Sequence, residues 1–251
     1  MKINQALQFG IKELQNSQTP NLDSEILLSW ILKKDKSYLF ANPDKNLNKP
    51  QVNRYKNLIQ KRRNKYPIAY LIGKKEFFGL DFFVNRNVLI PRPETEELVE
   101  QTLQEINKLY AIYHKPLAIL DLGTGSGCIA IAIAKNTKLP IKIYASDICK
   151  KALDLAKKNA KYHSIQIKFI QSDLLENIKK SHYAKATRDQ EPDIIVANLP
   201  YITPKVYSNL EPEITDFEPK KALLSQTRNH FYNLLKEELK KRNWNPILIL
   251  E

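Results

Sequence analysis

From Leu117 onward, short apolar runs alternate with amphipathic segments, and this alternation constrains the fold more than any other feature of the chain. The strand-like runs cover 117–120, 141–145, 166–170, 193–197 and 246–250, and the helical runs cover 128–136, 150–162 and 230–242. Such alternation predicts a mostly parallel sheet with helices on both faces. We therefore predict an α/β, Rossmann-like domain over 91–251, whose ligands bind beyond the carboxyl ends of the strands.

The first part of the chain has a different pattern. Apolar residues recur at helical spacing through 3–14 and 22–31, and a third such run follows Asn48-Lys49-Pro50, where a capping residue precedes a proline. We expect a small helical domain over 1–65. Between 66 and 90, aromatic residues flank Gly79 and Asp81, which indicates a short β-hairpin connector.

Composition excludes several classes of protein. The chain has 251 residues, 43% of them apolar, which is enough to fill two cores. Its longest apolar stretches fall far short of the roughly 20 residues of a membrane span, and residues 1–18 lack the apolar core of a secretory signal. We therefore expect a cytoplasmic protein with no membrane partner. Cys128 and Cys149 have no paired spacing and the four histidines are scattered, so we expect neither disulfides nor a metal site.

The net charge of +13 allows two interpretations. A positive field of this size would attract RNA, ribosomes or acidic proteins. Many of the lysines, however, lie on predicted helix faces, which favours an ordinary solvated basic surface. We adopt the second interpretation, under which no stable nucleic-acid partner is required.

The strand-like run at 117–120 leads into a glycine loop, Asp121-Leu122-Gly123-Thr124-Gly125-Ser126-Gly127. Glycines permit a sharp turn and close approach of a ligand, and the following helix offers unpaired amides. The spacing is G-x-G-x-G after an acid, unlike the dinucleotide pattern G-x-G-x-x-G. It favours a methionine-derived sulfonium cofactor. We expect Asp121 to organise its ammonium group, with the loop packed against its amino-acid portion.

Two further strand ends carry candidate cofactor residues. Asp147 can accept hydrogen bonds from both ribose hydroxyls. The alternative role for Asp147 is to cap the helix at 150–162, and both roles can hold together. Asp173 and Leu174 follow the third strand, and we expect them to border the adenine as a polar neighbour and an apolar wall.

Asn198-Leu199-Pro200-Tyr201, here called the corner, ends the apolar run at 193–197. A planar NH₂ group is a poor nucleophile until acceptors fix its protons and aim its nitrogen. The Asn198 side-chain oxygen and the Leu199 carbonyl can be those acceptors, while Pro200 stiffens the turn and Tyr201 packs on the substrate. An ordinary turn is the alternative. Because the corner follows Asp121, Asp147 and Asp173 in strand order, we favour methyl transfer to an amino or amide group.

Three blocks resemble a known family. They are Tyr66–Gly73, Glu76–Gly79, and Val88–Glu100, which contains Pro91-Arg92-Pro93-Glu94-Thr95-Glu96. They resemble peptide chain release factor N(5)-glutamine methyltransferases, the HemK/PrmC family of class I methyltransferases, and the resemblance covers essentially the whole chain. It implies S-adenosylmethionine as cofactor. It also implies methylation of the glutamine amide in the Gly-Gly-Gln loop of bacterial-type class 1 release factors, which modulates translation termination, and a release-factor-binding role for residues 1–65.

Carried over by position, the resemblance assigns residues to two ligands. It implies that the cofactor contacts Gly123 to Gly127, Asp147, Leu174 and Asn198, and that the substrate glutamine lies on the corner. It also implies that Arg92, Glu94 and Thr95 line the mouth of the cofactor site. The position of Leu174 is often aromatic in relatives.

The chain departs from the family pattern at three places. Leu199 replaces the first proline of the usual Asn-Pro-Pro-Tyr, which keeps the backbone carbonyl. Residues 181–191 are expected to be an insertion. After Glu218-Pro219 a Gly-rich segment is absent, and the chain ends at Glu251, just after the fifth predicted strand. Sheets of this type normally add a closing hairpin of two strands, so we expect a C-terminally truncated domain with uncovered edges.

Two other functions stay open at this stage. An adenine amino-methyltransferase acting on nucleic acid would share the logic of the corner and would use the +13 charge. An inactive remnant that only binds release factor would follow from missing strands. The block at 91–96 and the N-terminal helices favour the protein-glutamine methyltransferase.

Overall fold

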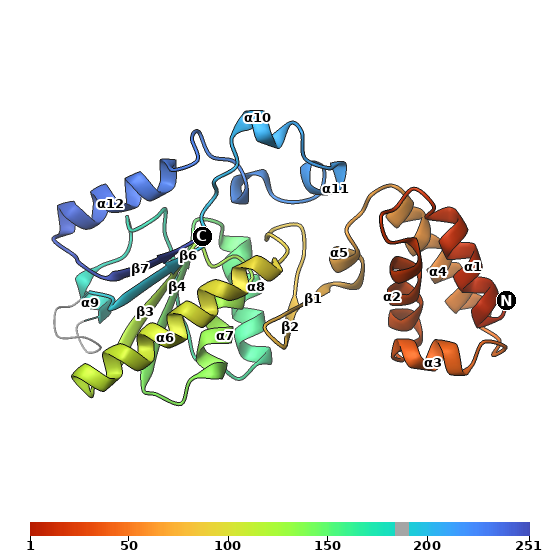
Figure 1. The fold of residues 1–251 in the computed structure, drawn as a ribbon, viewed down its shortest axis with the longest axis horizontal. Helices are drawn as coiled ribbons and strands as arrows, with labels where there is room; N and C mark the ends of the chain where they lie inside the picture. Colours follow the sequence, from red (N-terminus) through yellow and green to blue (C-terminus); the bar gives the residue numbers. More distant parts are fainter. Residues whose placement is uncertain (184–190) are drawn as a thin grey trace. The chain divides into compact units, whose positions relative to one another are not determined.

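The computed structural model describes residues 1–183 and 191–251, so most of the predicted insertion lies outside the described residues. The chain divides into two compact units (Figure 1). The helical unit comprises Met1–Gly73 together with Pro212–Phe217, and the sheet unit comprises Lys74–Glu211 together with Glu218–Glu251. The short segment 212–217 therefore interrupts the sheet unit in sequence and belongs to the helical unit.

The helical unit contains α1 (Ile3–Glu13), α2 (Pro20–Leu32), α3 (Lys36–Ala41), α4 (Lys49–Arg63), α5 (Ile68–Ile72) and α11 (Pro212–Thr215). The three helices predicted from apolar spacing correspond to α1, α2 and α4. Asn48 caps α4 as predicted, because its side chain accepts the Gln51 N–H while the Gln51 side chain accepts the Asn48 N–H. The core of the unit is built from fully buried side chains that include Ile3, Leu27 and Tyr55.

The sheet unit begins with the predicted hairpin. Strands β1 (Lys74–Phe77) and β2 (Leu80–Phe83) pair antiparallel. Phe78 and Gly79, the two turn residues, both have positive φ, at 51° and 72°. A two-residue hairpin turn with both residues at positive φ matches the right-handed twist of the strands it joins.

The main sheet has five parallel strands in the order β5-β4-β3-β6-β7. They are β3 (Leu117–Leu122), β4 (Ile141–Asp147), β5 (Lys168–Gln171), β6 (Ile194–Ala197) and β7 (Ile247–Leu250), close to the five predicted runs. The α/β fold class is confirmed. The strand order reverses between β3 and β6, which is where ligands bind in open α/β sheets.

Helices cover both faces of this sheet. On one face, α6 (Glu96–Tyr113), α7 (Cys128–Asn136) and α8 (Lys150–Tyr162) contribute buried residues to a single core. The opposite core includes Tyr183 of α9 (Lys180–Tyr183) and Leu235 and Leu239 of α12 (His230–Arg242). The remaining elements are short: η1 (Pro93–Thr95), α10 (Pro204–Tyr207) and η2 (Lys220–Ala222). Within the described ranges, no helix is both long and apolar enough to cross a membrane.

Candidate active site

The glycine loop joins β3 to α7 and follows a backbone path that its glycines make possible. Gly123, Gly125 and Gly127 all have positive φ, between 55° and 81°. A methyl group added at Gly127 would lie 3.2 Å from the Ala156 Cβ, so this glycine lets α7 and α8 pack closely. At Gly125 the nearest atom would be 4.0 Å away. The middle of the loop is therefore open to the close approach of a ligand.

Asp121, at the base of the loop, is fully buried. Its Oδ2 accepts hydrogen bonds from the Thr124 hydroxyl (2.5 Å) and from the Ala130 N–H (3.2 Å), so this carboxyl fixes the loop and the first turn of α7. Its Oδ1 has no hydrogen-bond partner among the described residues. Burial raises the pKa of Asp121 to about 7. An acceptor left unpaired in the interior is costly, and a cationic ligand group would satisfy it.

Asp147, at the end of β4, holds the same loop from the neighbouring strand. Its Oδ2 accepts the Gly125 N–H at 2.9 Å, and its Oδ1 accepts the Cys149 N–H at 2.8 Å. The N-cap of α8 is Cys149, so Asp147 supports the start of that helix without being its cap. Burial raises the pKa of Asp147. Each carboxyl oxygen keeps a second lone pair, and ligand hydroxyls can still donate to it.

Asp173 and Leu174 follow β5 and differ sharply in exposure. Asp173 is exposed, whereas Leu174 is buried in the core on the α12 face of the sheet. Leu174 has a φ of 38°, a left-handed conformation that is uncommon for a side chain of this size. Of the two, Leu174 has the environment expected of an apolar wall.

The corner begins where β6 ends, and its asparagine is held from two sides. The Asn198 Nδ2 donates to the Thr95 Oγ1 at 2.9 Å and to the Glu251 Oε2 at 2.8 Å. Leu199 is buried, and its Cδ2 would lie 3.2 Å from a methyl group added at Gly123. The fold therefore brings the glycine loop and the corner into contact. Pro200 is half-buried and Tyr201 is exposed.

A tyrosine that we did not predict as a site residue lies under the corner. The Tyr232 hydroxyl, on α12, donates to the Glu251 carbonyl, and the Leu199 carbonyl lies 3.4 Å from the same hydroxyl. Burial raises the pKa of Tyr232 to about 12, and burial followed by the nearby Glu251 charge raises the pKa of Tyr201. Both phenols therefore keep their protons at neutral pH.

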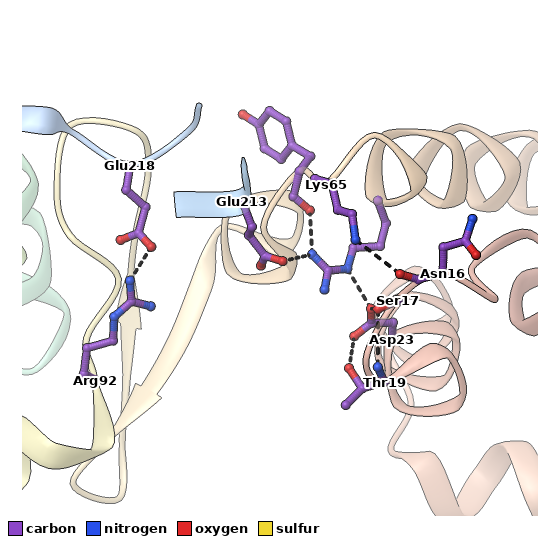
Figure 2. Close-up of polar contacts among 10 residues, drawn as sticks. Asn16, Ser17, Thr19, Asp23, Lys65, Arg92, Glu213 and Glu218 are labelled. Carbon is purple, nitrogen blue, oxygen red and sulfur yellow. Dashed lines mark hydrogen bonds and ion pairs between the residues drawn. The ribbon is translucent and has the colours of Figure 1, made fainter. Parts of the chain in front are cut away.

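The block at 91–96 is anchored by a second residue that we did not single out, Glu218. This carboxylate is almost fully buried, accepts the Ile90 N–H at 3.1 Å and forms an ion pair with Arg92 (Figure 2). Thr95 of the same block is buried and contacts Asn198. The block thus connects to the corner through Thr95, whereas Arg92 connects to the chain before η2.

Nothing in the described part of the chain resembles a metal centre. No group of three or more histidine, cysteine, aspartate or glutamate side chains in residues 1–183 and 191–251 could hold a metal ion. Cys128 and Cys149 are both free, and Cys128 is buried. The site is therefore built from carboxylates, amides, backbone groups and tyrosines.

Comparison with known proteins first gives the class. Residues 113–242 match the family described as a methyltransferase domain, and residues 5–73 match the family described as the PrmC N-terminal domain. Together with the parallel sheet, the glycine loop and the corner, these matches define an S-adenosylmethionine-dependent methyltransferase of the Rossmann-like type.

Relatives with similar sequences identify the family within this class. A release factor glutamine methyltransferase of Bacillus cereus is 34% identical over 240 residues, which cover 95% of this chain and 81% of the relative. A release factor glutamine methyltransferase of Buchnera aphidicola is 36% identical over 97% of this chain and 84% of its own length. Another, from Flavobacterium psychrophilum, is 39% identical over 79% of this chain and 67% of its own length. The chain belongs to the release factor glutamine methyltransferase family.

Proposed function

We propose that the chain methylates the side-chain amide nitrogen of the glutamine in the Gly-Gly-Gln loop of bacterial-type class 1 release factors, and thereby modulates translation termination. The proposal divides the chain into a release-factor-binding domain (1–65), a hairpin connector (66–90) and the methyltransferase domain (91–251). Because release factors act on translating ribosomes, the site of action is the cytoplasm.

The observation that carries the proposal is the orientation of the Asn198 side chain. Both hydrogens of its amide are donated inside the protein, to Thr95 and to Glu251. The remaining polar atom of the side chain, Oδ1, is an acceptor, and the Leu199 backbone carbonyl is a second acceptor in the corner. Two acceptors side by side suit the two N–H groups of a primary amide, which is what a glutamine side chain offers.

The residues around the glycine loop suit the cofactor. S-adenosylmethionine, when bound, supplies an electrophilic methyl group. The unpaired Asp121 Oδ1 suits an ammonium group, and the free lone pairs of Asp147 suit ribose hydroxyls. Gly125 leaves room for close approach. We assign Gly123, Thr124, Gly125, Ser126 and Gly127 to the cofactor, with Leu174 as the apolar wall and Asp173 as its polar neighbour.

The chemistry required of the protein is mainly positioning. An amide nitrogen is a weak nucleophile, so it must be held with its face toward the methyl group. In this proposal Asn198 and Leu199 fix the N–H groups, Pro200 stiffens the turn, and the exposed ring of Tyr201 lies against the amide plane. In the net change the amide nitrogen would exchange one hydrogen for the methyl group, the S–CH₃ bond of the sulfonium would break with its electron pair remaining on sulfur as a thioether, and one proton would be released to solvent.

The charge of the chain is consistent with an acidic protein partner. Residues 1–73 contain thirteen lysines and arginines against five aspartates and glutamates. With Glu213 and Asp216 of segment 212–217 included, the helical unit keeps a net positive charge, and such a charge accelerates encounter with an acidic surface. No stable nucleic-acid partner is required for this role.

One transfer experiment separates the proposed function from its alternatives. The purified chain is incubated with methyl-labelled S-adenosylmethionine and, in separate reactions, with a class 1 release factor or with total RNA. We expect label on the release factor only. Label on RNA alone would indicate an adenine amino-methyltransferase, and absence of label together with absence of cofactor binding would indicate an inactive remnant.

A further inference from the structure

We propose that Glu251, with Thr95, is a positioning residue that sets the orientation of the Asn198 amide for methyl transfer. The proposal rests on the proposed function, because it assigns Asn198 Oδ1 to the substrate. The contacts with Glu251 and Thr95 explain why that oxygen, and not the amide nitrogen, faces the substrate.

The side-chain amide of an asparagine can point in either of two directions. Its oxygen and nitrogen ends are nearly equal in shape, so contacts alone decide between two orientations that differ by a half turn. Only the orientation with the oxygen toward the substrate offers an acceptor to an incoming NH₂ group. The reverse orientation would present N–H groups to N–H groups and would repel the substrate.

The two partners of the Asn198 amide differ in what they can accept and donate. A threonine hydroxyl both donates and accepts, so Thr95 tolerates either orientation of Asn198. An ionised carboxylate only accepts. With the Glu251 Oε2 at 2.8 Å, the Asn198 nitrogen must face Glu251, since the reverse would set two oxygens against each other. Glu251 therefore decides the orientation, and Thr95, 2.9 Å away and buried, holds it.

Asn198 and Glu251 meet because their strands are paired. In the parallel ladder of β6 and β7, Ala197 is paired with Leu250, so the next residues in register are Asn198 and Glu251. The ladder continues past the named strands, because the Glu251 N–H donates to the Ala197 carbonyl at 3.2 Å. Neighbouring residues in register project to the same face of a sheet. The pairing of β6 with β7 therefore fixes the position of the Glu251 side chain relative to the Asn198 side chain.

The charge of Glu251 also affects the strength of the acceptor. A hydrogen bond from Nδ2 to a carboxylate draws positive charge toward the nitrogen and leaves the amide oxygen more negative. The polarised oxygen then accepts a stronger hydrogen bond from the substrate NH₂. Charge and orientation therefore act in the same direction.

The test uses an isosteric variant. Glu251→Gln keeps the size of the side chain but can offer either an acceptor or a donor to Asn198, so the orientation is no longer imposed. We expect kcat for release factor methylation to fall about 10-fold to 100-fold, as for a misaligned reacting group. The Kd for S-adenosylmethionine and the melting temperature should stay close to those of the unchanged protein. Glu237→Gln, an exposed position on α12, is the matched control. A kcat within about twofold of the unchanged protein would overturn the proposal.

Two further measurements test the proposal if Glu251→Gln folds poorly or if the enzyme has another substrate. Thr95→Val removes the second partner and should lower kcat, whereas Thr95→Ser should retain it; equal kcat values would contradict the proposal. In nuclear magnetic resonance spectra, the Asn198 side-chain NH₂ signal, assigned by its loss in Asn198→Ala, should move upfield in Glu251→Gln. An unmoved signal would refute the orientation itself. A protein that fails to methylate any release factor would instead refute the proposed function.

Discussion

The Asp147 carboxylate accepts a hydrogen bond from the Gly125 N–H at 2.9 Å, so the end of β4 holds the middle of the glycine loop that follows β3. The two residues are 22 positions apart in the chain. Their contact gives one carboxylate two roles in the proposed function: it shapes the loop, and it offers its remaining lone pairs to a ligand.

Asp147→Ala should therefore weaken cofactor binding through the loop as well as through the lost ligand contact. A hydrogen bond to a charged group contributes about 1.5–3 kcal/mol, so we expect the Kd for S-adenosylmethionine to rise about 10-fold to 100-fold. Isothermal titration calorimetry measures the effect. Asp154→Ala, an exposed position on α8, is the control. An unchanged Kd in Asp147→Ala would contradict the assignment.

Asp121 gives a pH-dependent prediction for the cofactor-free protein. Its pKa rises from 3.8 to about 7 because it is buried. Between these values the unfolded chain has lost the Asp121 proton and the folded chain has kept it, so this group lowers the free energy of unfolding as pH rises. Asp121→Asn cannot ionise. The stability of the variant relative to the unchanged protein should therefore increase from about pH 4 to about pH 7 and level off above, in urea unfolding at several pH values. A difference that is constant with pH would rule out the raised pKa.

Arg62 is the centre of a partly buried ionic network within the helical unit, in which the pair with Asp23 is the more buried. Its Nε lies 2.6 Å from Asp23 Oδ2 and its Nη1 lies 2.5 Å from Glu213 Oε2, and Asp23 also accepts from Ser17 and Thr19 (Figure 2). Removing one partner of a buried pair leaves an uncompensated charge, so Arg62→Ala should destabilise the unit by about 3–5 kcal/mol. Hydrogen exchange of the α4 backbone amides reports this unit directly.

The neighbouring arginine provides the matched control for this experiment. Arg63 is exposed and pairs with Glu13 at 2.9 Å. A surface pair of this kind contributes about 0–1 kcal/mol, so Arg63→Ala should leave the exchange rates nearly unchanged. Equal effects of the two substitutions would show that the Arg62 network does not stabilise the unit.

Two substitutions in the corner distinguish the role of the Asn198 side chain from that of the Leu199 backbone carbonyl. Asn198→Ala removes the acceptor itself, so kcat should fall by about 100-fold or more, with only a modest change in the Kd of S-adenosylmethionine. Leu199→Ala removes buried carbon atoms and should cost about 2–4 kcal/mol of stability. It keeps the carbonyl, so its turnover well below the melting temperature should stay within about threefold. A larger loss of turnover in Leu199→Ala than in Asn198→Ala would reverse the assigned roles.

Much of the fold could be predicted because its signal is local. Period and length of the apolar runs placed β3 to β7 and helices α7, α8 and α12. The helices α3 and α5 were not predicted, since segments of six and five residues are too short to show a helical period. The grouping of 212–217 with the helical unit also has no local signal, because it depends on contacts such as that of Glu213 with Arg62.

The places of the candidate site residues at the strand ends could be predicted, whereas most of their contacts could not. Strand ends followed by Asp121, Asp147 and Asn198 could be read from the sequence, because parallel strands place such residues at one edge. The partners of Asn198 could not, since Thr95 and Glu251 lie 103 and 53 residues away. The strand order that sets β7 beside β6 would have been needed to predict Glu251.

The central claim is that the methyl group goes to a glutamine amide of a release factor, and locating the methyl group tests it most directly. A class 1 release factor is incubated with the chain and S-adenosylmethionine, digested, and sequenced by tandem mass spectrometry. We expect one methyl group on the glutamine side chain of the Gly-Gly-Gln loop, and none when that glutamine is replaced by glutamate. A methyl group on any other residue, or an unmodified release factor beside methylated RNA, would contradict the account.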